Sequence, residues 1–513
     1  CICRCRRICI FHMKGNDGQM IKRLTELAAL LPNARLLGDD AEITSIERDS
    51  RCVRKGALFA CITGAHVDAH SFIPNVARAG ARAILTEREN VDVPAGLSVL
   101  HVPNIQEALD VIAPYFYDYP ARSMRVIGIT GTNGKTTTSY LLRAILRHAG
   151  KRVGLIGTIQ VMMEDEVFPT ANTTPDVIVM QQLLAEMRTR GMDVVVMEVS
   201  SHALDQERVA GIEFDTAVFT NLTQDHLDYH KTMENYARAK ARLFDLVSEQ
   251  GSKSGKTAVL NADDGASATM RVHTRCPVIS YGVEQPADLA AQDVHLAQDG
   301  MELTLVHKDA RPVRIHIGIT GLFNVSNVLA ATGAALAEKI PAEDIVAALS
   351  EFTGVPGRFE LVRAGQDFSV IVDYAHTPDG MENVLRTARA VTAGRIIVVF
   401  GCGGDRDRTK RPIMGRMAAE LADIVVLTSD NPRTENPAAI LDEVETGVLP
   451  VIGTKPYEKL VDRRTAIFHA VQTARKGDTV VILGKGHENY QILKDQTIHF
   501  DDRETAREAI GGL

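Results

Sequence analysis

The chain has 513 residues, with 57 basic and 65 acidic side chains, and its formal net charge at pH 7 is -8. Its composition, 45% hydrophobic and 24% charged, is that of a globular protein, and its length predicts about three domains. We expect no nucleic-acid partner, because nucleic acids select for basic protein faces. We expect no membrane partner either, because no apolar run reaches the roughly 18 residues that a spanning helix needs.

The N-terminal stretch CICRCRRICIFHMKGNDGQM is unusual, because its first nine residues hold four of the eight cysteines. Their C-x-C-x-C-x3-C spacing matches no usual zinc site, so a metal knuckle is the weaker interpretation. Arginines interrupt each short apolar run, which argues against a signal peptide. We interpret residues 1–19 as a spurious or disordered extension from a start placed too far upstream, and expect the first helix to open at Met20.

The other four cysteines are scattered along the chain, at Cys52, Cys61, Cys276 and Cys402. Dispersed cysteines of this kind are typical of proteins from a reducing compartment. We therefore expect a cytoplasmic protein.

Alternating strand and helix patterns divide the chain into three α/β blocks, at residues 20–108, 109–354 and 355–513. The central block contains RVIGIT, MDVVVMEVS and DTAVFTNL, which we predict to be parallel strands buried on both faces. The third block follows the linker Pro356-Gly357, and each of its four β-branched runs ends in charged residues. Ligands of open α/β sheets bind at the carboxyl ends of strands, so these residues predict one crevice. We expect a small N-terminal α/β domain, a central P-loop-type domain with a mostly parallel sheet, and a C-terminal Rossmann-like domain.

The segment RVIGITGTNGKTTTSY joins an apolar run to a helical pattern through a glycine-containing turn. Gly131 and Gly134 let the backbone turn sharply and expose its N–H groups. The helix N-terminus and Lys135 would neutralise bound phosphate, and Thr136 would be available to Mg²⁺. Ile129 stands where the strict phosphate-loop motif has glycine, so a chance strand–turn–helix segment is the alternative.

Two further strand ends carry residues suited to a metal ion. Glu198 closes VVVMEVS, where a buried carboxylate is costly unless it is paired or metal-bound. TNLTQDHLDYH supplies Asp225, His226 and Asp228. A salt-bridged Glu198 and a structural His226 are the alternatives, but beside a phosphate loop we favour metal ligands.

TGTNGKTT is the form that this loop takes in the Mur ligases, and the chain resembles that family from about residue 20 onward. The resemblance implies ATP-dependent amide-bond formation in peptidoglycan precursor synthesis. In that reaction a D-glutamate carboxylate attacks the γ-phosphate of ATP, and the amine of an incoming amino acid captures the acyl phosphate. The catalytic residues that it implies are Lys135, Glu198, His226 and Lys240. The Mg²⁺ ligands that it implies are Thr136, Glu198, His226 and Lys240.

In ENYARAKARLF, Tyr236, Lys240 and Phe244 fall on one helical face, where a lysine is poorly solvated. A lysine that snorkels to water is the alternative. In the family, the matching lysine reacts with CO2 to become a carbamate (N6-carboxylysine), which requires a neutral amine. By resemblance we assign this modification to Lys240.

The resemblance also implies two nucleotide sites. The ATP-binding residues are Gly131, Thr132, Asn133, Gly134, Lys135, Thr136, Thr137, Asn327, Arg358 and Asp373. The residues that bind the UDP-muramoyl dipeptide are Ser50, His66, Asn172, Thr173, Thr174, Ser200, Gln206 and Arg208. Ordinary caps, helix turns or loops are the alternatives for individual members of both sets. Arg48 and Ala69 depart from the pattern of the uridine pocket.

The third block carries the residues that the resemblance assigns to diaminopimelate: Arg406, Asp430, Asn431, Pro432, Arg433, Gly484 and Glu488. An arginine suits the distal carboxylate of this acceptor, while Asn431 and Glu488 would receive its ammonium. D-N-P-R is the form in diaminopimelate-adding members, and lysine-adding relatives replace the arginine. A simple turn at the N-P pair is the alternative.

We therefore expect a monomeric ligase that joins meso-diaminopimelate to the D-glutamate of UDP-N-acetylmuramoyl-L-alanyl-D-glutamate, with ATP as co-substrate and Mg²⁺ as cofactor. A lysine-adding or folylpolyglutamate-type relative is the nearest alternative. A nucleotide-binding regulator that hydrolyses ATP slowly is a more distant one, and the joint presence of Glu198, His226 and Lys240 counts against it.

Overall fold

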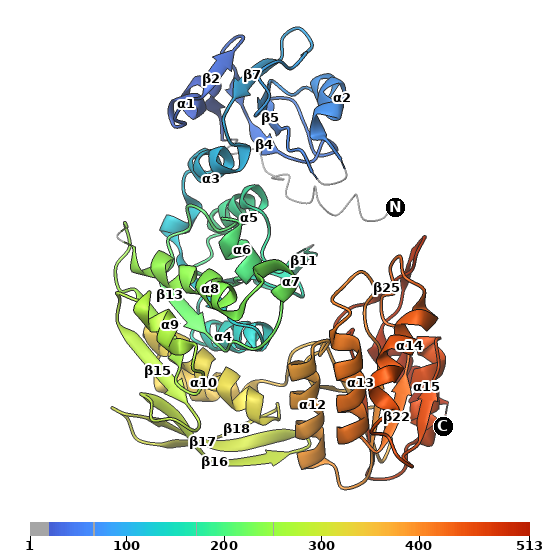
Figure 1. Cartoon of the computed structure of the whole chain (residues 1–513). Helices are drawn as coiled ribbons and strands as arrows, with labels where there is room; N and C mark the ends of the chain where they lie inside the picture. The colour runs from blue at the N-terminus through green and yellow to red at the C-terminus, as the bar shows by residue number, and fades with distance from the viewer. Residues whose placement is uncertain (1–19, 65–66, 171, 250, 513) are drawn as a thin grey trace. The chain divides into compact units, whose positions relative to one another are not determined.

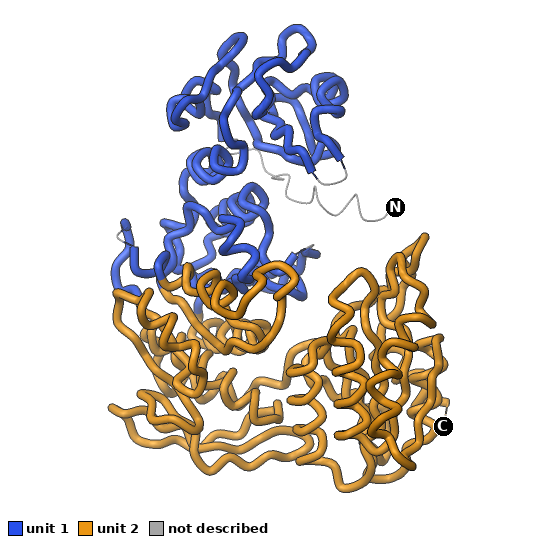
Figure 2. Tube along the Cα trace, in the orientation of Figure 1, with its two compact units in different colours: residues 1–128, 151–215, 245–256 blue, residues 129–150, 216–244, 257–513 orange. Residues whose placement is uncertain are grey.

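The computed structural model of the chain describes residues 20–64, 67–170, 172–249 and 251–512. The expectations for residues 1–19 and for His66 lie outside these ranges. The chain forms two compact units, shown in Figure 2. Unit 1 comprises residues 1–128, 151–215 and 245–256, and unit 2 comprises residues 129–150, 216–244 and 257–513.

The N-terminal part of unit 1 contains a five-stranded sheet in the order β2-β7-β6-β5-β4. Its strands are β2 (Arg35–Leu37), β4 (Ser45–Glu47), β5 (Ala57–Ala60), β6 (Ala83–Thr86) and β7 (Ser98–His101). All are parallel except β2. Side chains alternate along β5: Phe59 joins a core with α2 (Ile73–Arg78), and Leu58 joins a core with α1 (Leu24–Ala29) and α3 (Ile105–Phe116).

The first helix does not open at Met20, as we expected from the sequence. Residues Lys22–Arg23 instead form strand β1, which pairs with β3 (Glu42–Ile43), and α1 begins at Leu24. Lys22 and Arg23 are therefore extended and not helical. The helix that follows is short and buries Leu24 and Leu27.

The rest of unit 1 holds strands β9 (Val153–Ile156), β10 (Val161–Met163), β11 (Glu166–Phe168) and β12 (Val194–Glu198). β12 runs parallel to β9, whereas β10 is antiparallel to β9 and to β11. Helix α5 (Val177–Thr189) packs against α3 in a shared apolar core, and the short α6 (Ser201–Asp205) follows β12. Strand β8 (Arg125–Thr130) carries the chain from unit 1 into unit 2.

In unit 2, β13 (Thr216–Phe219), β14 (Thr257–Asn261) and β15 (Val278–Gly282) are parallel. They continue into the hairpins of β16 (Leu289–Ala297), β17 (Gly300–His307) and β18 (Val313–Ile317). Helix α10 (Leu322–Ala337) contacts strands β13, β14, β15 and β16 and helix α4 (Lys135–His148). The remaining helices of this part are α7 (Leu227–His230), α8 (Met233–Ser248), α9 (Ser267–Val272) and α11 (Ala342–Glu351).

The C-terminal part of unit 2 is a six-stranded sheet in the order β19-β20-β24-β21-β22-β23. Its strands are β19 (Glu360–Leu361), β20 (Ser369–Asp373), β21 (Ile396–Phe400), β22 (Ile424–Leu427), β23 (Tyr457–Lys459) and β24 (Thr479–Leu483). All pairs are parallel except β19 with β20.

Helices cover both faces of this C-terminal sheet. Helices α12 (Pro378–Val391), α13 (Lys410–Leu421) and α14 (Pro437–Val448) lie side by side and share one core (Figure 1). Helices α15 (Arg463–Thr473) and α16 (Asp502–Gly511) form the core of the other face. The charged residues after β20, β21, β22 and β24 therefore emerge at one edge, as we predicted. A small ribbon of β25 (Tyr490–Ile492) and β26 (Thr497–His499) follows β24.

The α/β fold class predicted from the sequence is confirmed. Within the described ranges, no helix combines the length and the apolar character that crossing a membrane requires. Cys61, Cys276 and Cys402 form no disulfide bond, whereas Cys52 is disulfide-bonded.

Candidate active site

The turn between β8 and α4 is a tight loop whose two glycines are required by their surroundings. Gly131 and Gly134 adopt φ values of 147° and 85°, which side chains rarely tolerate. A Cβ atom at Gly131 would overlap the hydroxyl of Thr220, and one at Gly134 would overlap the amide oxygen of Asn327. The predicted adenine-site residue Asn327 thus packs directly beneath the loop, where its Nδ2 donates to Asn324 Oδ1 at 2.9 Å.

The segment after β13 holds this loop in place. Thr220 Oγ1 donates to the carbonyl oxygen of Asn133 at 2.6 Å, and Asn221 Oδ1 accepts the backbone N–H of Asn133 at 2.9 Å. The backbone N–H of Thr132 donates to the carbonyl of Asn221 at 2.8 Å. These bonds tie the loop to the segment after β13. The remaining backbone N–H groups at the start of α4 can therefore donate to a bound anion.

Two lysines converge on the loop. Lys135 Nζ donates to the carbonyl oxygens of Gly131 and Thr132 at 2.9 Å each, and Lys240 Nζ donates to that of Gly131 at 2.8 Å. Lys240 is 1% exposed, and its ammonium lies 4.3 Å from the ring centroid of Tyr236. Burial and, next, the charge of Lys135 lower the pKa of Lys240 well below its usual value. The snorkelling alternative is therefore wrong, and the site favours a neutral amine.

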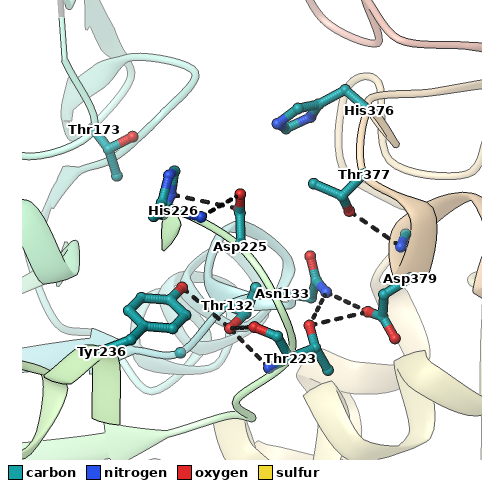
Figure 3. A network of polar contacts seen from close by, with 12 residues as sticks. Thr132, Asn133, Thr173, Thr223, Asp225, His226, Tyr236, His376, Thr377 and Asp379 are labelled. Carbon is teal, nitrogen blue, oxygen red and sulfur yellow. Dashed lines mark hydrogen bonds and ion pairs between the residues drawn. The ribbon is translucent and has the colours of Figure 1, made fainter. Parts of the chain in front are cut away.

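A carboxylate from the C-terminal sheet region also touches the loop. Asp379, in the first turn of α12, accepts from Asn133 Nδ2 at 2.5 Å and from Thr223 Oγ1 at 3.3 Å (Figure 3). Thr132 Oγ1 lies 3.2 Å from the Tyr236 hydroxyl and donates to the carbonyl of Thr223 at the same distance. Burial raises the pKa of Asp379. Sequence reasoning missed this residue, although an acidic side chain directly after a Thr-Pro helix start was a usable signal.

His226 precedes α7 with a left-handed φ of 53°. Its backbone N–H donates to Asp225 Oδ1 at 2.8 Å, and its Nε2 lies 3.4 Å from Asp225 Oδ2 (Figure 3). Burial raises the pKa of Asp225, but the charges of His226 and His376 outweigh that effect and leave the pKa below its ordinary value. The exposed imidazole of His226 is thus oriented by an ionised carboxylate next to the loop.

Arg358, which we assigned to ATP, contacts the loop from the start of the C-terminal sheet region. Its Nη2 donates to Thr136 Oγ1 at 3.2 Å, and its guanidinium lies 4.5 Å from the ring centroid of Tyr374. The carboxylate of Asp373 accepts hydrogen bonds from backbone N–H groups, those of Phe359 at 2.6 Å and Ala375 at 2.7 Å. Asp373 thereby fixes the backbone that carries Arg358.

In unit 1, the fully buried Glu198 accepts two hydrogen bonds from Thr158, at 3.0 Å from its backbone N–H and at 2.8 Å from its hydroxyl. The Thr158 hydroxyl also lies 3.1 Å from that of Thr173. The preceding Gly157 leaves room for this carboxylate, since a Cβ there would overlap it. Sequence reasoning did not identify Thr158, which lies in an irregular segment with no motif.

Most residues assigned to the UDP-muramoyl dipeptide form one network around the start of α6. Thr174 Oγ1 donates to the carbonyl of Glu198 at 2.9 Å and accepts the backbone N–H of Ser200 at 3.1 Å. Arg208 donates to the carbonyl of Thr174 at 3.1 Å and to Gln206 Oε1 at 2.7 Å. Ser50 lies apart from this network, in the turn after β4, and Asn172 is exposed.

The residues assigned to diaminopimelate gather at the carboxyl edge of the C-terminal sheet. Arg433, with φ of 52°, donates through Nη1 to the carbonyl of Gly404 at 2.8 Å. Arg406 lies beside it, since a Cβ at Gly403 would come within 4 Å of both Arg433 Nη1 and Arg406 Cγ. Burial and then the charge of Arg406 lower the pKa of Arg433, and two neighbouring guanidiniums favour an anion. Asn431 Nδ2 donates to Glu488 Oε2 at 2.9 Å. A Cβ at Gly484 would overlap the Asp430 carboxylate.

Of the predicted Mg²⁺ ligands, Thr136, His226 and Lys240 belong to unit 2, whereas Glu198 belongs to unit 1. Across the described ranges, no group of three or more His, Cys, Asp or Glu side chains is placed to hold a metal ion. The predicted set includes a hydroxyl and a modified lysine, so it stays a prediction. Three of its four members would offer Mg²⁺ the oxygen ligands that it prefers, namely the hydroxyl of Thr136, the carboxylate of Glu198 and the carbamate of Lys240.

Three family models match the chain. They are the Mur ligase family catalytic domain over residues 42–117, the Mur ligase middle domain over residues 129–335, and the Mur ligase glutamate ligase domain over residues 357–486. A curated relative from Bacillus cereus, named UDP-N-acetylmuramoyl-L-alanyl-D-glutamate–2,6-diaminopimelate ligase, is 49% identical over 92% of this chain and 95% of its own length.

The chain belongs to the Mur ligase family. A solved structure described by the same ligase name aligns with a TM-score of 0.64 and 33% identity, and the match covers 92% of this chain and 95% of that one. The crystal structure of MurF ligase from Thermotoga maritima in complex with ADP aligns with a TM-score of 0.65 over 91% of this chain and 96% of that one. Because that protein is only 19% identical, the likeness concerns the fold alone.

Family membership explains why residues from distant segments surround the phosphate loop of this Mur ligase. The loop itself contributes Lys135, the segment after β13 contributes His226, and helix α8 contributes Lys240. Arg358 and Asp379 come from the C-terminal sheet region and contact the loop directly. A fully buried lysine, Lys485, lies among the residues assigned to diaminopimelate and was missed by sequence reasoning.

Proposed function

We propose that this Mur ligase joins diaminopimelate to the D-glutamate of UDP-N-acetylmuramoyl-L-alanyl-D-glutamate at the expense of ATP. The single observation that carries the choice of acceptor is the juxtaposition of Arg406 and Arg433 with Glu488 and Asp430 at one sheet edge. Two guanidiniums suit a carboxylate, and two carboxylates suit an ammonium. The distal end of diaminopimelate carries both groups, whereas lysine carries only the ammonium.

The first chemical step is phosphoryl transfer. A glutamate carboxylate oxygen attacks the γ-phosphorus, the bond to the bridging oxygen breaks, and ADP departs with that electron pair. The loop N–H groups and Lys135 stabilise the charge that spreads over the phosphoryl oxygens. Arg358, held 3.2 Å from the Thr136 hydroxyl, is placed to contribute positive charge at the same loop.

In the second step, the free amine of diaminopimelate attacks the acyl carbon, phosphate leaves, and the amine loses a proton. Binding the acceptor by its distal end orients the reacting amine, which converts an encounter between two molecules into a unimolecular step. Thr173, Thr174, Ser200 and Arg208 would hold the peptide part of the sugar nucleotide through neutral donors and one cation.

We further propose that Lys240 is carbamylated: the ammonium first loses a proton, and the neutral amine then attacks CO2 and loses a second proton, which leaves a carbamate anion. Thr136, Glu198, His226 and the carbamate would hold Mg²⁺, which would supply charge neutralisation to the phosphates. The lowered pKa of Lys240 supports this assignment, because the neutral form is the reactive one. We also propose that the enzyme acts in the cytoplasm, where charged small-molecule substrates such as ATP are found, and that it is a monomer.

The test is an acceptor comparison with purified enzyme, ATP, Mg²⁺ and the UDP-muramoyl dipeptide. Diaminopimelate, lysine and glutamate are supplied separately, and product mass and ADP release are measured. We expect extension by one diaminopimelate with ADP released in equal amount. Preferred extension by lysine would indicate a lysine-adding enzyme, and ADP release without an extended product would indicate a nucleotide-hydrolysing regulator.

A further inference from the structure

Lys485 is the buried cation beneath the residues assigned to diaminopimelate. It follows β24 in the turn Gly484-Lys485-Gly486 and is 0% exposed. Its Nζ lies 3.1 Å from Glu488 Oε2 and 3.4 Å from Asn431 Oδ1, and 5.4 Å from the ring centroid of Tyr490. Removing an ammonium from water is costly unless charged and polar partners replace the water. Glu488 and Asn431 are those partners.

The contacts of Asn431 fix which way its carboxamide points. Oδ1 accepts the backbone N–H of Ile492 at 2.9 Å and faces the ammonium of Lys485, while Nδ2 donates to Glu488 Oε2 at 2.9 Å. Both neighbours of Oδ1 are donors and the neighbour of Nδ2 is an acceptor. A flipped amide would therefore face donors with its own N–H groups and lose all three bonds.

This orientation determines what Asn431 offers to a ligand. Both lone pairs of Oδ1 are engaged, and one N–H of Nδ2 is engaged by Glu488, so the remaining N–H is a donor. A donor suits a carboxylate and repels an ammonium. In this geometry we therefore assign the ammonium of the acceptor to the carboxylates, and a carboxylate to the remaining N–H of Asn431.

The two carboxylate oxygens of Glu488 have different surroundings. Oε2 accepts hydrogen bonds from Lys485 Nζ and Asn431 Nδ2. Among the described residues, Oε1 has no hydrogen-bond donor and can accept one from a ligand. The side chain is 14% exposed, so Oε1 is the atom positioned for an incoming ammonium. Arg433 and the remaining N–H of Asn431 then face a carboxylate.

We propose that Lys485 is a positioning residue that sets the choice of acceptor amino acid. Its ammonium contacts Asn431 Oδ1 and Glu488 Oε2. This leaves the Asn431 N–H to meet the distal carboxylate of the ligand, and Glu488 Oε1 to meet its distal ammonium. This inference deepens the proposed function and rests on it. Lys485 itself touches no substrate.

The experiment replaces Lys485 with methionine, which has similar length and no charge, and uses Lys494→Met as the control. Lys494 is exposed in the same C-terminal segment. Without the ammonium, Asn431 Oδ1 and Glu488 Oε2 each lose one partner, so the amide N–H and the carboxylate oxygen that face the ligand are held less firmly in place. We expect the KM for diaminopimelate to rise about tenfold or more, as for a lost charge-assisted hydrogen bond, while the KM for ATP stays within about twofold of the wild-type value.

The decisive readout is the ratio of kcat/KM for diaminopimelate to that for lysine. A merely structural role would lower both values together and leave the ratio unchanged, whereas a positioning role lowers the ratio. An unchanged ratio in folded Lys485→Met enzyme would overturn the inference. Wild-type enzyme that fails to extend with diaminopimelate would instead overturn the proposed function, so the two failures are distinguishable.

Lys485→Met leaves the Glu488 charge without its buried partner, which can prevent folding. The double variant Lys485→Met/Glu488→Gln removes both charges and avoids this cost. Glu488→Gln alone is measured beside it. We expect the double variant to fold and to have a lower diaminopimelate-to-lysine ratio than Glu488→Gln alone, because only the double variant releases Asn431. Equal ratios in the two variants would contradict a role for Lys485.

Discussion

Lys135 and Lys240 donate to the same atom, the carbonyl oxygen of Gly131, at 2.9 and 2.8 Å. Two ammonium groups that share one acceptor repel each other, and the repulsion is greater where water is excluded. Lys240 is buried, and burial and then the charge of Lys135 lower its pKa. The phosphate loop thus favours the reactive neutral amine at Lys240, while Lys135 is the loop cation of the proposed phosphate site.

The first prediction concerns the stability of the enzyme without CO2. The folded-state pKa of Lys240 lies below its unfolded value of about 10.5, so the unfolded chain binds more protons in the pH window between the two values. The free energy of unfolding must then rise with pH across that window. We expect Lys240→Met to weaken this rise and to abolish ligation, as measured by thermal unfolding in CO2-free buffers. Lys231→Met, at an exposed site, is the control. An identical pH dependence in Lys240→Met and wild type would show that Lys240 is charged in the folded protein.

The second prediction tests the phosphate loop. Lys135→Ala removes the loop cation that would stabilise the transferring phosphoryl group, and we expect kcat for ADP release to fall by about a hundredfold or more. ADP release is measured with both the dipeptide substrate and diaminopimelate present. Lys151→Ala, an exposed lysine just beyond the same helix, is the matched control. Undiminished turnover in Lys135→Ala would remove this loop from the active site.

The third prediction separates backbone strain from steric overlap in the loop. Gly134 and Gly150 have similar positive φ values, 85° and 75°, at the two ends of α4. A Cβ at Gly134 overlaps Asn327, whereas nothing lies within 4 Å of a Cβ at Gly150. Both alanine variants should lose about 1 kcal/mol from the strained φ. Only Gly134→Ala should also raise the KM for ATP, by about tenfold for a misplaced loop, because only there must the loop and Asn327 move apart. Equal KM values in both variants would contradict this account.

The parts of this fold that were predictable from sequence are those where one local pattern determines one local structure. β8 and the loop after it follow from an apolar run that ends in Gly131 and Gly134. The parallel strands of the C-terminal sheet follow from β-branched runs such as that ending at Asp373. In contrast, β1 was not predictable, because its extended shape depends on pairing with β3, a partner about twenty residues away.

The same distinction applies to the site. Lys135 was assigned from its own motif, but the contact between Asn133 and Asp379 joins residues 246 positions apart, which no local pattern encodes. Asp373 was assigned to ATP by resemblance, and both of its carboxylate oxygens accept backbone N–H groups, which no local pattern indicates. Lys485 was not singled out from the sequence, because its contact with Asn431 depends on how the ends of β22 and β24 meet.

The last prediction concerns acceptor binding. Arg433→Ala removes the guanidinium placed beside Arg406, and a lost charge-assisted hydrogen bond to a ligand carboxylate costs about 1.5–3 kcal/mol. We therefore expect the KM for diaminopimelate to rise roughly tenfold to a hundredfold, with little change in the KM for ATP. Any slow use of lysine should be unaffected, since lysine has no distal carboxylate. Arg464→Ala is the control, because it removes an exposed arginine that pairs with Glu508 at 2.5 Å and lies over the ring of Phe468. Parallel increases in the KM values of ATP and diaminopimelate would mean that Arg433 supports the fold of this sheet edge and does not bind the acceptor.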